Sequence, residues 1–225
     1  MTRPAVTTAV EAVAQDLRAA ILTGSPAPGE WLREQALAAE YQVARHTLRA
    51  ALRALASERL LVIEPHRGAR VASLDGPQLE ALFELRTALE VEAARLSAAR
   101  LPTGTWPAAV REAADELDRR CAAPDADGPG RAAVDAAHLG LHHALVAAAG
   151  SPRITSAHAA LATESRLVLL QSRPGLPVGR MARLHRELLE NLRQHGPEAL
   201  RAHLSQGRAL SEEVRRTPDV RSTPR

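Results

Sequence analysis

The chain has 225 residues, and its 29 basic and 26 acidic side chains give a net charge of +3 at pH 7. The sequence pI of about 10.2 overstates this basicity, because every basic residue is arginine and only one Tyr and one Cys titrate between neutrality and the arginine range. A case for an anionic partner therefore depends on where the arginines lie, not on how many there are.

Composition excludes several classes of protein. Aromatic residues make up 2% of the chain, and the hydrophobic 45% is mostly Ala, Leu and Val, which favours helices over a β-sandwich or barrel. We find no apolar run long enough for a transmembrane helix and no signal-peptide pattern. The single Cys121 excludes an intrachain disulfide and a cysteine-based zinc knuckle. We expect a soluble, cytoplasmic, mostly α-helical protein that has no membrane partner.

The first part of the chain has the pattern of a winged helix-turn-helix. Thr8 and Glu11 can form a capping box that opens a helix, and Gly24 helps to end it. A short helix over 33–41 follows, and then a longer helix with Leu48, Ala51, Leu52 and Leu55 on one face. Two short extended runs around Pro65-His66-Arg67-Gly68 predict a β-hairpin, the wing of such a domain.

After Asp75-Gly76-Pro77 only helical patterns remain. We expect a winged helix-turn-helix domain over 1–72, an all-helical domain over 73–216, and a disordered tail over 217–225. The helices of the second domain are predicted near 77–100, 105–122, 131–149, 151–172, 179–194 and 197–215.

Arginines occupy the positions from which a helix-turn-helix contacts DNA. The second helix enters the major groove by its first residues, and here Arg45 and Arg49 share one face, opposite the leucines. Arginine donates two parallel hydrogen bonds that match guanine or a phosphate. The alternative is a solvated helix face, although residues 33–70 hold seven Arg and four Glu, a local charge of 7 − 4 = +3. The candidate DNA contacts are Arg33, Arg45, His46, Thr47, Arg49, His66, Arg67 and Gly68.

The same stretch resembles the N-terminal domain of GntR-type bacterial regulators. The resemblance includes Gly29-Glu30-Trp31-Leu32-Arg33-Glu34, Ala44-Arg45-His46-Thr47-Leu48-Arg49, and the wing from His66 to Val71. The family usually has Ser-Arg-Thr-Pro-Val-Arg at the turn. Ala44 replaces the Ser and so removes a helix cap, and Arg59 replaces a Gly that commonly ends the recognition helix.

Charged residues lie on an apolar face in the first helix of the second domain. Arg86 and Glu90 share the stripe of Leu79, Leu82 and Phe83. A buried charge is costly unless it is paired. Two interpretations follow, and both can hold: Arg86 forms an internal ion pair, or it lines a cavity and binds the carboxylate or phosphate of a ligand.

Histidines show the same anomaly in three later helices. His138 and His142 are spaced i, i+4, while His185 and His203 lie on apolar faces of the last two predicted helices. Imidazoles that converge inside a helical bundle often bind Zn²⁺ or a similar divalent ion. His158 also faces inward, so periodicity alone does not distinguish ligands from hydrogen-bonded core histidines.

The helical part is similar to the FCD effector-binding domain of the FadR subfamily of GntR regulators. The motifs are Glu84-Leu85-Arg86-Thr87-Ala88-Leu89-Glu90, the run from His138 to Leu145, Leu184-His185-Arg186 and Leu200-Arg201-Ala202-His203-Leu204. In that family an Asp and three His bind a metal beneath a cavity for organic acids. By position the metal ligands would be His138 in place of Asp, His142, His185 and His203. A neutral ligand at 138 favours zinc or nickel over manganese, and Asp135 falls off the helix face of these histidines.

Together these features predict a ligand-responsive, dimeric transcription factor that acts as a repressor. An organic acid bound through the metal and Arg86 would shift the two DNA-binding domains of the dimer relative to each other. They would then no longer match the two half-sites of the DNA operator, which lie about one helical turn apart. One alternative is a DNA-binding dimer whose helical domain is vestigial. Another is a metal-dependent enzyme, which would need a general acid or base that only Glu90 offers near the histidines.

Overall fold

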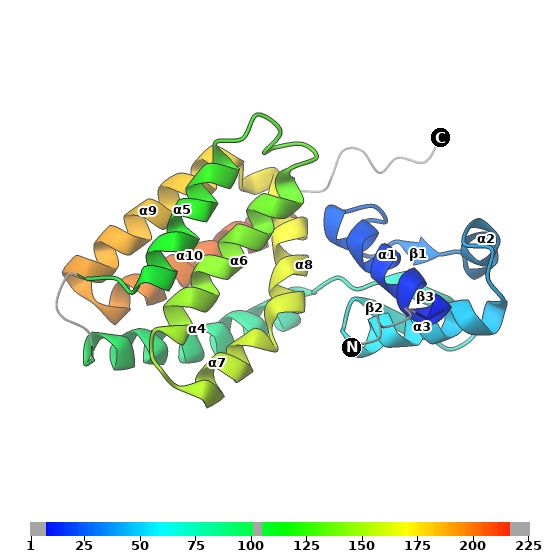
Figure 1. Ribbon diagram of the computed structural model, residues 1–225, viewed down its shortest axis with the longest axis horizontal. Coiled ribbons are helices and arrows are strands. Elements are labelled where there is room, and N and C mark those ends of the chain that lie inside the picture. Colours follow the sequence, from blue (N-terminus) through cyan, green and yellow to red (C-terminus); the bar gives the residue numbers. More distant parts are fainter. Residues whose placement is uncertain (1–7, 101–104, 217–225) are drawn as a thin grey trace, which may run out of the picture. The chain divides into compact units, whose positions relative to one another are not determined.

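The structure is a computed structural model that describes residues 8–100 and 105–216. The chain forms two compact units, with the division between Ser73 and Leu74. Helices dominate both units, and the N-terminal one also has a three-stranded antiparallel sheet (Figure 1). The predicted fold class, mostly α with a small β wing and a helical second domain, is confirmed. The predicted tail over 217–225 lies outside the described residues.

The N-terminal unit begins with the predicted capping box. The Thr8 hydroxyl accepts a hydrogen bond from the Glu11 backbone N–H at 3.2 Å, and the Glu11 carboxylate accepts one from the Thr8 N–H at 2.8 Å. The helix ends at Gly24, whose φ of 100° is in the left-handed region. The elements of this unit are α1 (Ala9–Thr23), β1 (Trp31–Leu32), α2 (Glu34–Glu40), α3 (Arg45–Ser57), β2 (Leu61–Glu64) and β3 (Gly68–Val71).

The wing contains one more strand than the sequence indicated. The strands are ordered β1-β3-β2, and β2 pairs with β3 in the register Leu61↔Val71 and Ile63↔Ala69. The additional strand, β1, pairs Trp31 with Arg70. Because β1 has only two residues, no alternation of apolar and polar side chains could reveal it.

The core of the N-terminal unit positions the recognition helix α3. Leu48, Leu52 and Leu55 are buried on the face of α3 that packs against α1, so the opposite face is left to solvent. Directly after α3, Arg59 has a φ of 61°. This left-handed conformation favours glycine, the residue that the GntR-type pattern commonly has in place of Arg59.

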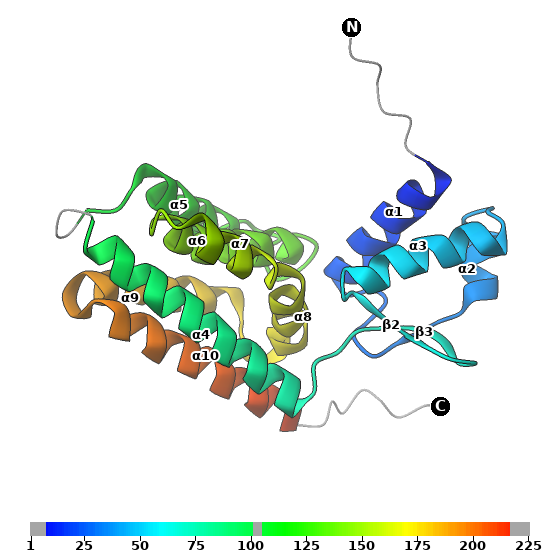
Figure 2. The same ribbon diagram turned by 90° about the horizontal axis from the view of Figure 1, so that it is seen from below.

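The second unit is a bundle of helices. Figures 1 and 2 show α4 lying along α10, and α5 along α6. Its elements are α4 (Gly76–Ala98), α5 (Ala108–Cys121), α6 (Arg131–Ala147), α7 (Pro152–Ala159), α8 (Ala162–Ser172), the 3₁₀ turn η1 (Arg173–Gly175), α9 (Val178–His195) and α10 (Pro197–Arg216).

The prediction of a single helix over 151–172 is wrong, because the structure has two helices there. The break lies at Ala160 and Leu161, although no Gly or Pro is present after Pro152 to mark it. Packing explains the break: α7 packs against α4 and α6, whereas α8 packs against α6 and α10. Leu161 is buried at the corner, so tertiary contacts override a sequence that suits one continuous helix.

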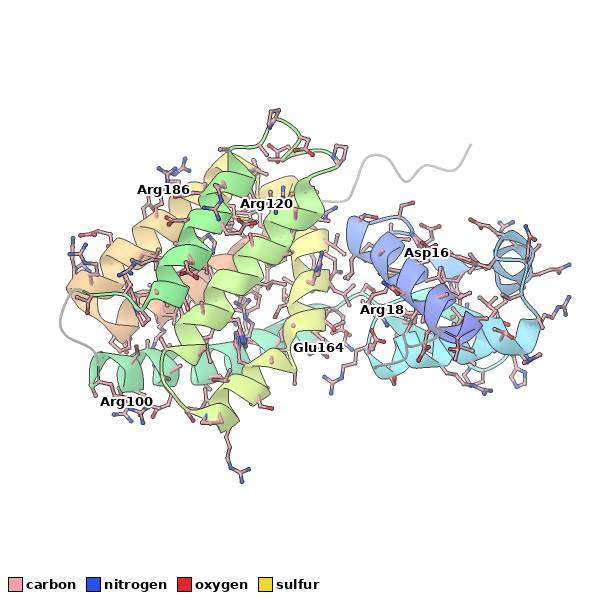
Figure 3. The ribbon with its side chains drawn as sticks, viewed as in Figure 1. Asp16, Arg18, Arg100, Arg120, Glu164 and Arg186 are labelled. Carbon is pink, nitrogen blue, oxygen red and sulfur yellow. The ribbon has the colours of Figure 1, made fainter. Side chains whose placement is uncertain are left out.

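The outer faces of the bundle carry paired arginines. Arg120 on α5 and Arg186 on α9 lie on the outside of the bundle (Figure 3) and have the acidic partners Glu116, at 2.7 Å, and Asp118, at 3.6 Å. Among the described residues, no helix is both long and apolar enough to cross a membrane.

Candidate functional site

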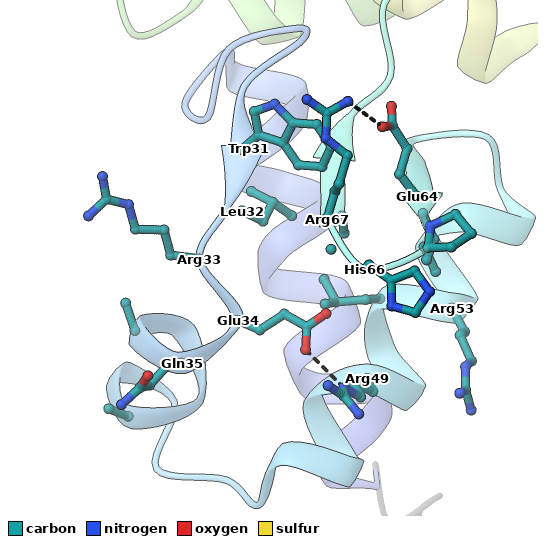
Figure 4. Close-up of a pocket in the computed structure, with 17 residues that line it drawn as sticks. Trp31, Leu32, Arg33, Glu34, Gln35, Arg49, Arg53, Glu64, His66 and Arg67 are labelled. Carbon is teal, nitrogen blue, oxygen red and sulfur yellow. Dashed lines mark hydrogen bonds and ion pairs between the residues drawn. The ribbon is translucent and has the colours of Figure 1, made fainter.

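An open groove in the N-terminal unit gathers most of the predicted DNA contacts. It has a volume of about 1000 Å³ and lies between the start of α2, the outer face of α3 and the tip of the wing (Figure 4). The remaining candidates form the first turn of α3, where Arg45 and His46 are exposed and Thr47 is half-buried. The predicted residues that line the groove are Arg33, Arg49, His66, Arg67 and Gly68.

The first turn of α3 is held by its packing rather than by a cap. Ala44 occupies the N-cap position and makes no side-chain cap hydrogen bond, as expected from the loss of the Ser. The first backbone N–H groups of α3 are thus not capped by a side chain, and helix N-termini of this kind attract anions such as phosphate.

Two of the groove arginines have acidic partners that sequence reasoning missed. The Arg49 Nε lies 2.9 Å from Glu34, and Arg67 lies 3.1 Å from Glu64 and 5.3 Å above the Trp31 ring (Figure 4). Exposed pairs of this kind are weak, so a phosphate or a base edge can replace the carboxylate. Glu34 stands fifteen residues before Arg49, a separation from which no local pattern predicts contact.

The wing tip needs unusual backbone conformations. His66 and Gly68 both have positive φ, 64° and 96°. Glycine adopts such values without strain, which accounts for Gly68, while His66 is held there by the tight turn between β2 and β3. The turn presents His66 and Arg67 at the rim of the groove.

In the helical unit, the structure brings the predicted histidines together. His138 and His142 come from α6 and His185 from α9, and one nitrogen from each of the three lies within 4.8 Å of the others. His203, from α10, borders this group, with its ring centroid 4.7 Å from that of His185 and 5.5 Å from that of His142. The four rings meet in the interior of the bundle.

Hydrogen bonds fix which nitrogens point into the cluster. The His142 Nδ1 lies 2.6 Å from a Glu90 carboxylate oxygen, and the His185 Nδ1 lies 2.8 Å from the Met181 carbonyl oxygen. Both partners only accept hydrogen bonds, so both Nδ1 atoms carry the proton. If both rings are neutral, each Nε2 atom then has a lone pair in place of a proton. The two Nε2 atoms face each other 3.3 Å apart, and a cation between them would stabilise this arrangement.

Burial keeps the four rings neutral. It lowers the pKa of His138, His142 and His203 below the usual 6.5, and it lowers the pKa of His185 to about 3. The Nδ1 of His138 is buried without a hydrogen-bond partner. Neutral imidazoles with free nitrogen lone pairs are the form in which histidine binds metals, so the residues present fit a divalent ion.

Arg86 and Glu90 form the internal ion pair that the sequence suggested. Arg86 lies 2.9 Å from Glu90, and both side chains are almost fully buried. Burial would raise the pKa of Glu90, but Arg86 and the neighbouring histidines outweigh it and hold the pKa well below 4.5. His158, on α7, also approaches Glu90, at 3.3 Å, so this inward-facing histidine belongs to the carboxylate and not to the cluster.

A small, partly open cavity adjoins the histidine cluster. It measures about 60 Å³, which is room for only a few water molecules. Its walls combine the four histidines and Arg86 with apolar and hydroxyl side chains from α8 and α10. These additional lining residues include Val168, Leu169, Leu204, Leu210, Ser165, Ser172 and Ser211.

Asp135 has a separate place in the bundle. It is fully buried, although it falls off the helix face of the histidines, and it is held between Arg131 at 3.0 Å and Arg173 at 2.8 Å. It is therefore separate from the group formed by His138, His142 and His185, as its place on the helix predicts.

Known proteins match both units. The model of the gntR family of bacterial regulatory proteins matches residues 9–71, and the FCD domain model matches residues 81–206. The HTH-type transcriptional repressor GlaR of Escherichia coli K12 is 31% identical over 196 residues, which cover 87% of this chain and 86% of that protein. The chain belongs to the GntR family.

Further relatives of this GntR protein agree. A probable D-xylose utilization operon transcriptional repressor of Paenarthrobacter nicotinovorans is 30% identical over 176 residues, covering 76% of this chain and 72% of that protein. The crystal structure of a putative GntR transcriptional regulator from Rhodococcus sp. RHA1 superposes with a TM-score of 0.70 at 26% identity, covering 91% of this chain and 97% of that one.

Membership of the GntR family settles the class of function. The chain is a DNA-binding transcriptional regulator with an FCD domain, because the family and the named relatives are transcriptional regulators. The metal-dependent enzyme considered from the sequence is therefore excluded. The groove beside α3 is lined by three of the arginines predicted to contact DNA, Arg33, Arg49 and Arg67.

Proposed function

We propose that this GntR protein is a ligand-responsive repressor of the FadR subfamily that acts as a cytoplasmic homodimer. Its FCD domain would bind a small organic acid through a divalent metal ion and Arg86. The metal site depends most on one observation: the Nε2 atoms of His142 and His185 lie 3.3 Å apart in a buried cluster. Repression is suggested by the relatives, which are named as repressors.

Operator DNA would be bound by α3 and the wing. Arg45, Arg49, His46 and Thr47 would enter the major groove, and a second copy of the chain would occupy the other half-site. Arg33 would contact the phosphate backbone, and the wing residues His66, Arg67 and Gly68 the adjacent minor groove. The exposed Leu85 on α4 is one of the apolar side chains that the partner copy could cover.

The metal would be held by His138, His142, His185 and His203. Four neutral nitrogen ligands favour zinc or nickel over harder ions. When bound, the metal would act as the point that attracts a carboxylate into the bundle. Arg86, on the cavity wall, would donate its remaining N–H groups to the same carboxylate.

The size of the cavity links the binding of an acid to movement. Because about 60 Å³ is available, an acid larger than a few atoms enters only if α8 or α10 shifts. Helix α8 lines the cavity with Ser165 and Ser172, and it also carries Gln171. The Gln171 side-chain oxygen accepts a hydrogen bond from the Leu74 backbone N–H at 3.3 Å, and its NH₂ group donates one to the Leu74 carbonyl oxygen at 3.5 Å. Leu74 is the first residue of the helical unit, so a shift of α8 reaches the link to the DNA-binding domain.

Operator binding and metal content test the two halves of the proposal. The double variant Arg45→Ala/Arg49→Ala should bind DNA from the promoter of its own gene at least 10-fold more weakly, because each lost arginine contact costs about 1–3 kcal/mol. The control variant Arg119→Ala, at an exposed position of the helical unit, should bind this DNA as wild type does.

Purified wild-type protein should contain about one metal ion. The variant His142→Ala/His185→Ala should lose it, while the control variant His143→Ala keeps it. Unchanged operator affinity in the first case, or equal metal content in the second, would contradict the corresponding half.

The coupling is tested with organic acids. An acid that weakens operator binding by wild-type protein should have less effect on Gln171→Ala, whose metal content and operator affinity without acid stay at the wild-type level. Operator binding that ignores every acid tried would favour the alternative of a dimer with a vestigial helical domain.

A further inference from the structure

Glu90 lies at the centre of a buried network and has no role in the proposed function as stated so far. One of its carboxylate oxygens, Oε2, accepts a hydrogen bond from the His142 Nδ1 at 2.6 Å. The other, Oε1, accepts one from the Arg86 Nε at 2.9 Å and lies 3.3 Å from the His158 Nε2. The Glu90 side chain is completely buried, so water does not compete for these contacts.

We propose that Glu90 is a positioning residue for the metal site: it fixes the tautomer and orientation of His142 and supplies the buried negative charge that His138 does not. This inference rests on the proposed function, in which the histidines bind a divalent ion.

The geometry gives each carboxylate oxygen a separate task. Arg86 and His158 hold Oε1, so the carboxylate cannot rotate freely, and Oε2 stays directed at the His142 ring. The Nδ1 of His142 must then donate, and its Nε2 faces His185. A carboxylate behind a ligating histidine orients the ring and makes the opposite nitrogen a stronger ligand.

Charge gives a second reason for a carboxylate at this position. Four neutral imidazoles leave the charge of a divalent ion uncompensated, and a buried uncompensated charge is costly. The corresponding contact of His185 is the neutral Met181 carbonyl oxygen. The other fully buried acid of the bundle, Asp135, is bound by Arg131 and Arg173. Among the described contacts of the histidine cluster, the negative partner is therefore Glu90.

The test is metal affinity in the full chain after chelator treatment. Zn²⁺ affinity by competition and the visible spectrum of bound Co²⁺ are measured for wild type, Glu90→Gln and the matched control Asp135→Asn, which also removes one fully buried negative charge. We expect Glu90→Gln to bind Zn²⁺ 10–100-fold more weakly, as is typical when such a partner is lost, and to alter the Co²⁺ spectrum. Asp135→Asn should bind within about threefold of wild type by the same reasoning.

A double variant separates positioning from simple neutralisation of Arg86. If Glu90 only balances Arg86, then Arg86→Gln/Glu90→Gln regains wild-type Zn²⁺ affinity; if Glu90 positions His142, the double variant stays weak. Wild-type affinity in Glu90→Gln or in the double variant would overturn the inference. If wild-type protein binds none of Zn²⁺, Ni²⁺ and Co²⁺, the metal-binding part of the proposed function itself fails.

Nitrogen NMR of the wild-type histidines keeps the inference testable even if these variants do not fold. In the Zn²⁺-loaded protein, the His142 Nδ1 should carry a proton and the Nε2 should show the shift of a metal-bound nitrogen. A metal-bound Nδ1, or an Nδ1 without its proton, would contradict the role of Glu90.

Discussion

The two domains each contain an Arg–Glu ion pair of the same length, but one pair is exposed and the other is buried. Arg49 and Glu34 in the DNA-binding domain lie 2.9 Å apart with 61% and 30% of their side chains exposed. Arg86 and Glu90 in the FCD domain lie 2.9 Å apart with 7% and 0% exposed. The distance is the same, so burial decides what each pair contributes.

The exposed pair is suited to exchange its partner. Water screens it, and exposed pairs contribute only about 0.2–1 kcal/mol, so a DNA phosphate or guanine can take the place of Glu34 at little cost. The buried pair cannot open in this way, because each charge that lost its partner would remain in a medium that solvates it poorly. The arginine of the exposed pair is thus free to change its partner, whereas the arginine of the buried pair is fixed in place.

The largest effect is expected from breaking the buried pair. Arg86→Leu leaves the Glu90 carboxylate without its main cation and should lower the free energy of unfolding by about 3–5 kcal/mol. The matched control is Arg95→Leu on the same helix, which breaks the exposed pair with Glu92 at 2.7 Å and should cost at most about 1 kcal/mol. Urea denaturation followed by circular dichroism measures both. Similar losses in the two variants would show that burial does not separate these pairs.

A smaller effect is expected from protonation of the histidine cluster. The pKa of His185 is about 3 in the folded chain and 6.5 when unfolded, so the unfolded state binds more protons between these values and stability falls as the pH drops below 6.5. Between pH 7 and 5.5, His185 alone should cost about 1.3 kcal/mol. Chelator-treated His185→Leu should lose correspondingly less stability over this range than chelator-treated wild type.

The exposed His143, adjacent to His142 in sequence, provides the control. His143→Leu replaces a ring that is exposed in the folded chain and is measured beside His185→Leu under the same conditions. If His185→Leu and His143→Leu behave alike, burial of the cluster is not the cause of acid sensitivity.

Helical periodicity revealed much of this molecule from sequence alone. The face shared by His138 and His142, and those of His185 and His203, follow from spacing along each helix, and the winged helix-turn-helix follows from the order of its elements. Periodicity also placed Arg86 and Glu90 on a buried face, which is where they lie.

What the sequence did not reveal depends on contacts between distant segments. The hydrogen bond from His142 to Glu90 spans 52 residues, and the contact of His158 with Glu90 spans 68. The break at Leu161 and the burial of Asp135 arise from packing against several helices at once. Spacing within one helix assigns a residue to a face, but it does not say which neighbour that face meets.

The smallest effect is expected from the exposed pair, and it concerns DNA affinity rather than stability. Glu34→Gln removes the partner that competes with DNA for Arg49, so operator affinity should rise about two- to fivefold while unfolding changes by less than about 1 kcal/mol. Glu40→Gln is the matched control, because Glu40 is exposed on the same helix and its loss changes the net charge equally. Fluorescence anisotropy with operator DNA at fixed salt measures both variants. If operator affinity rises equally in the two variants, the cause is overall charge and Arg49 has no part in it. If operator affinity rises only in Glu34→Gln, Arg49 is the arginine that exchanges its carboxylate partner for DNA.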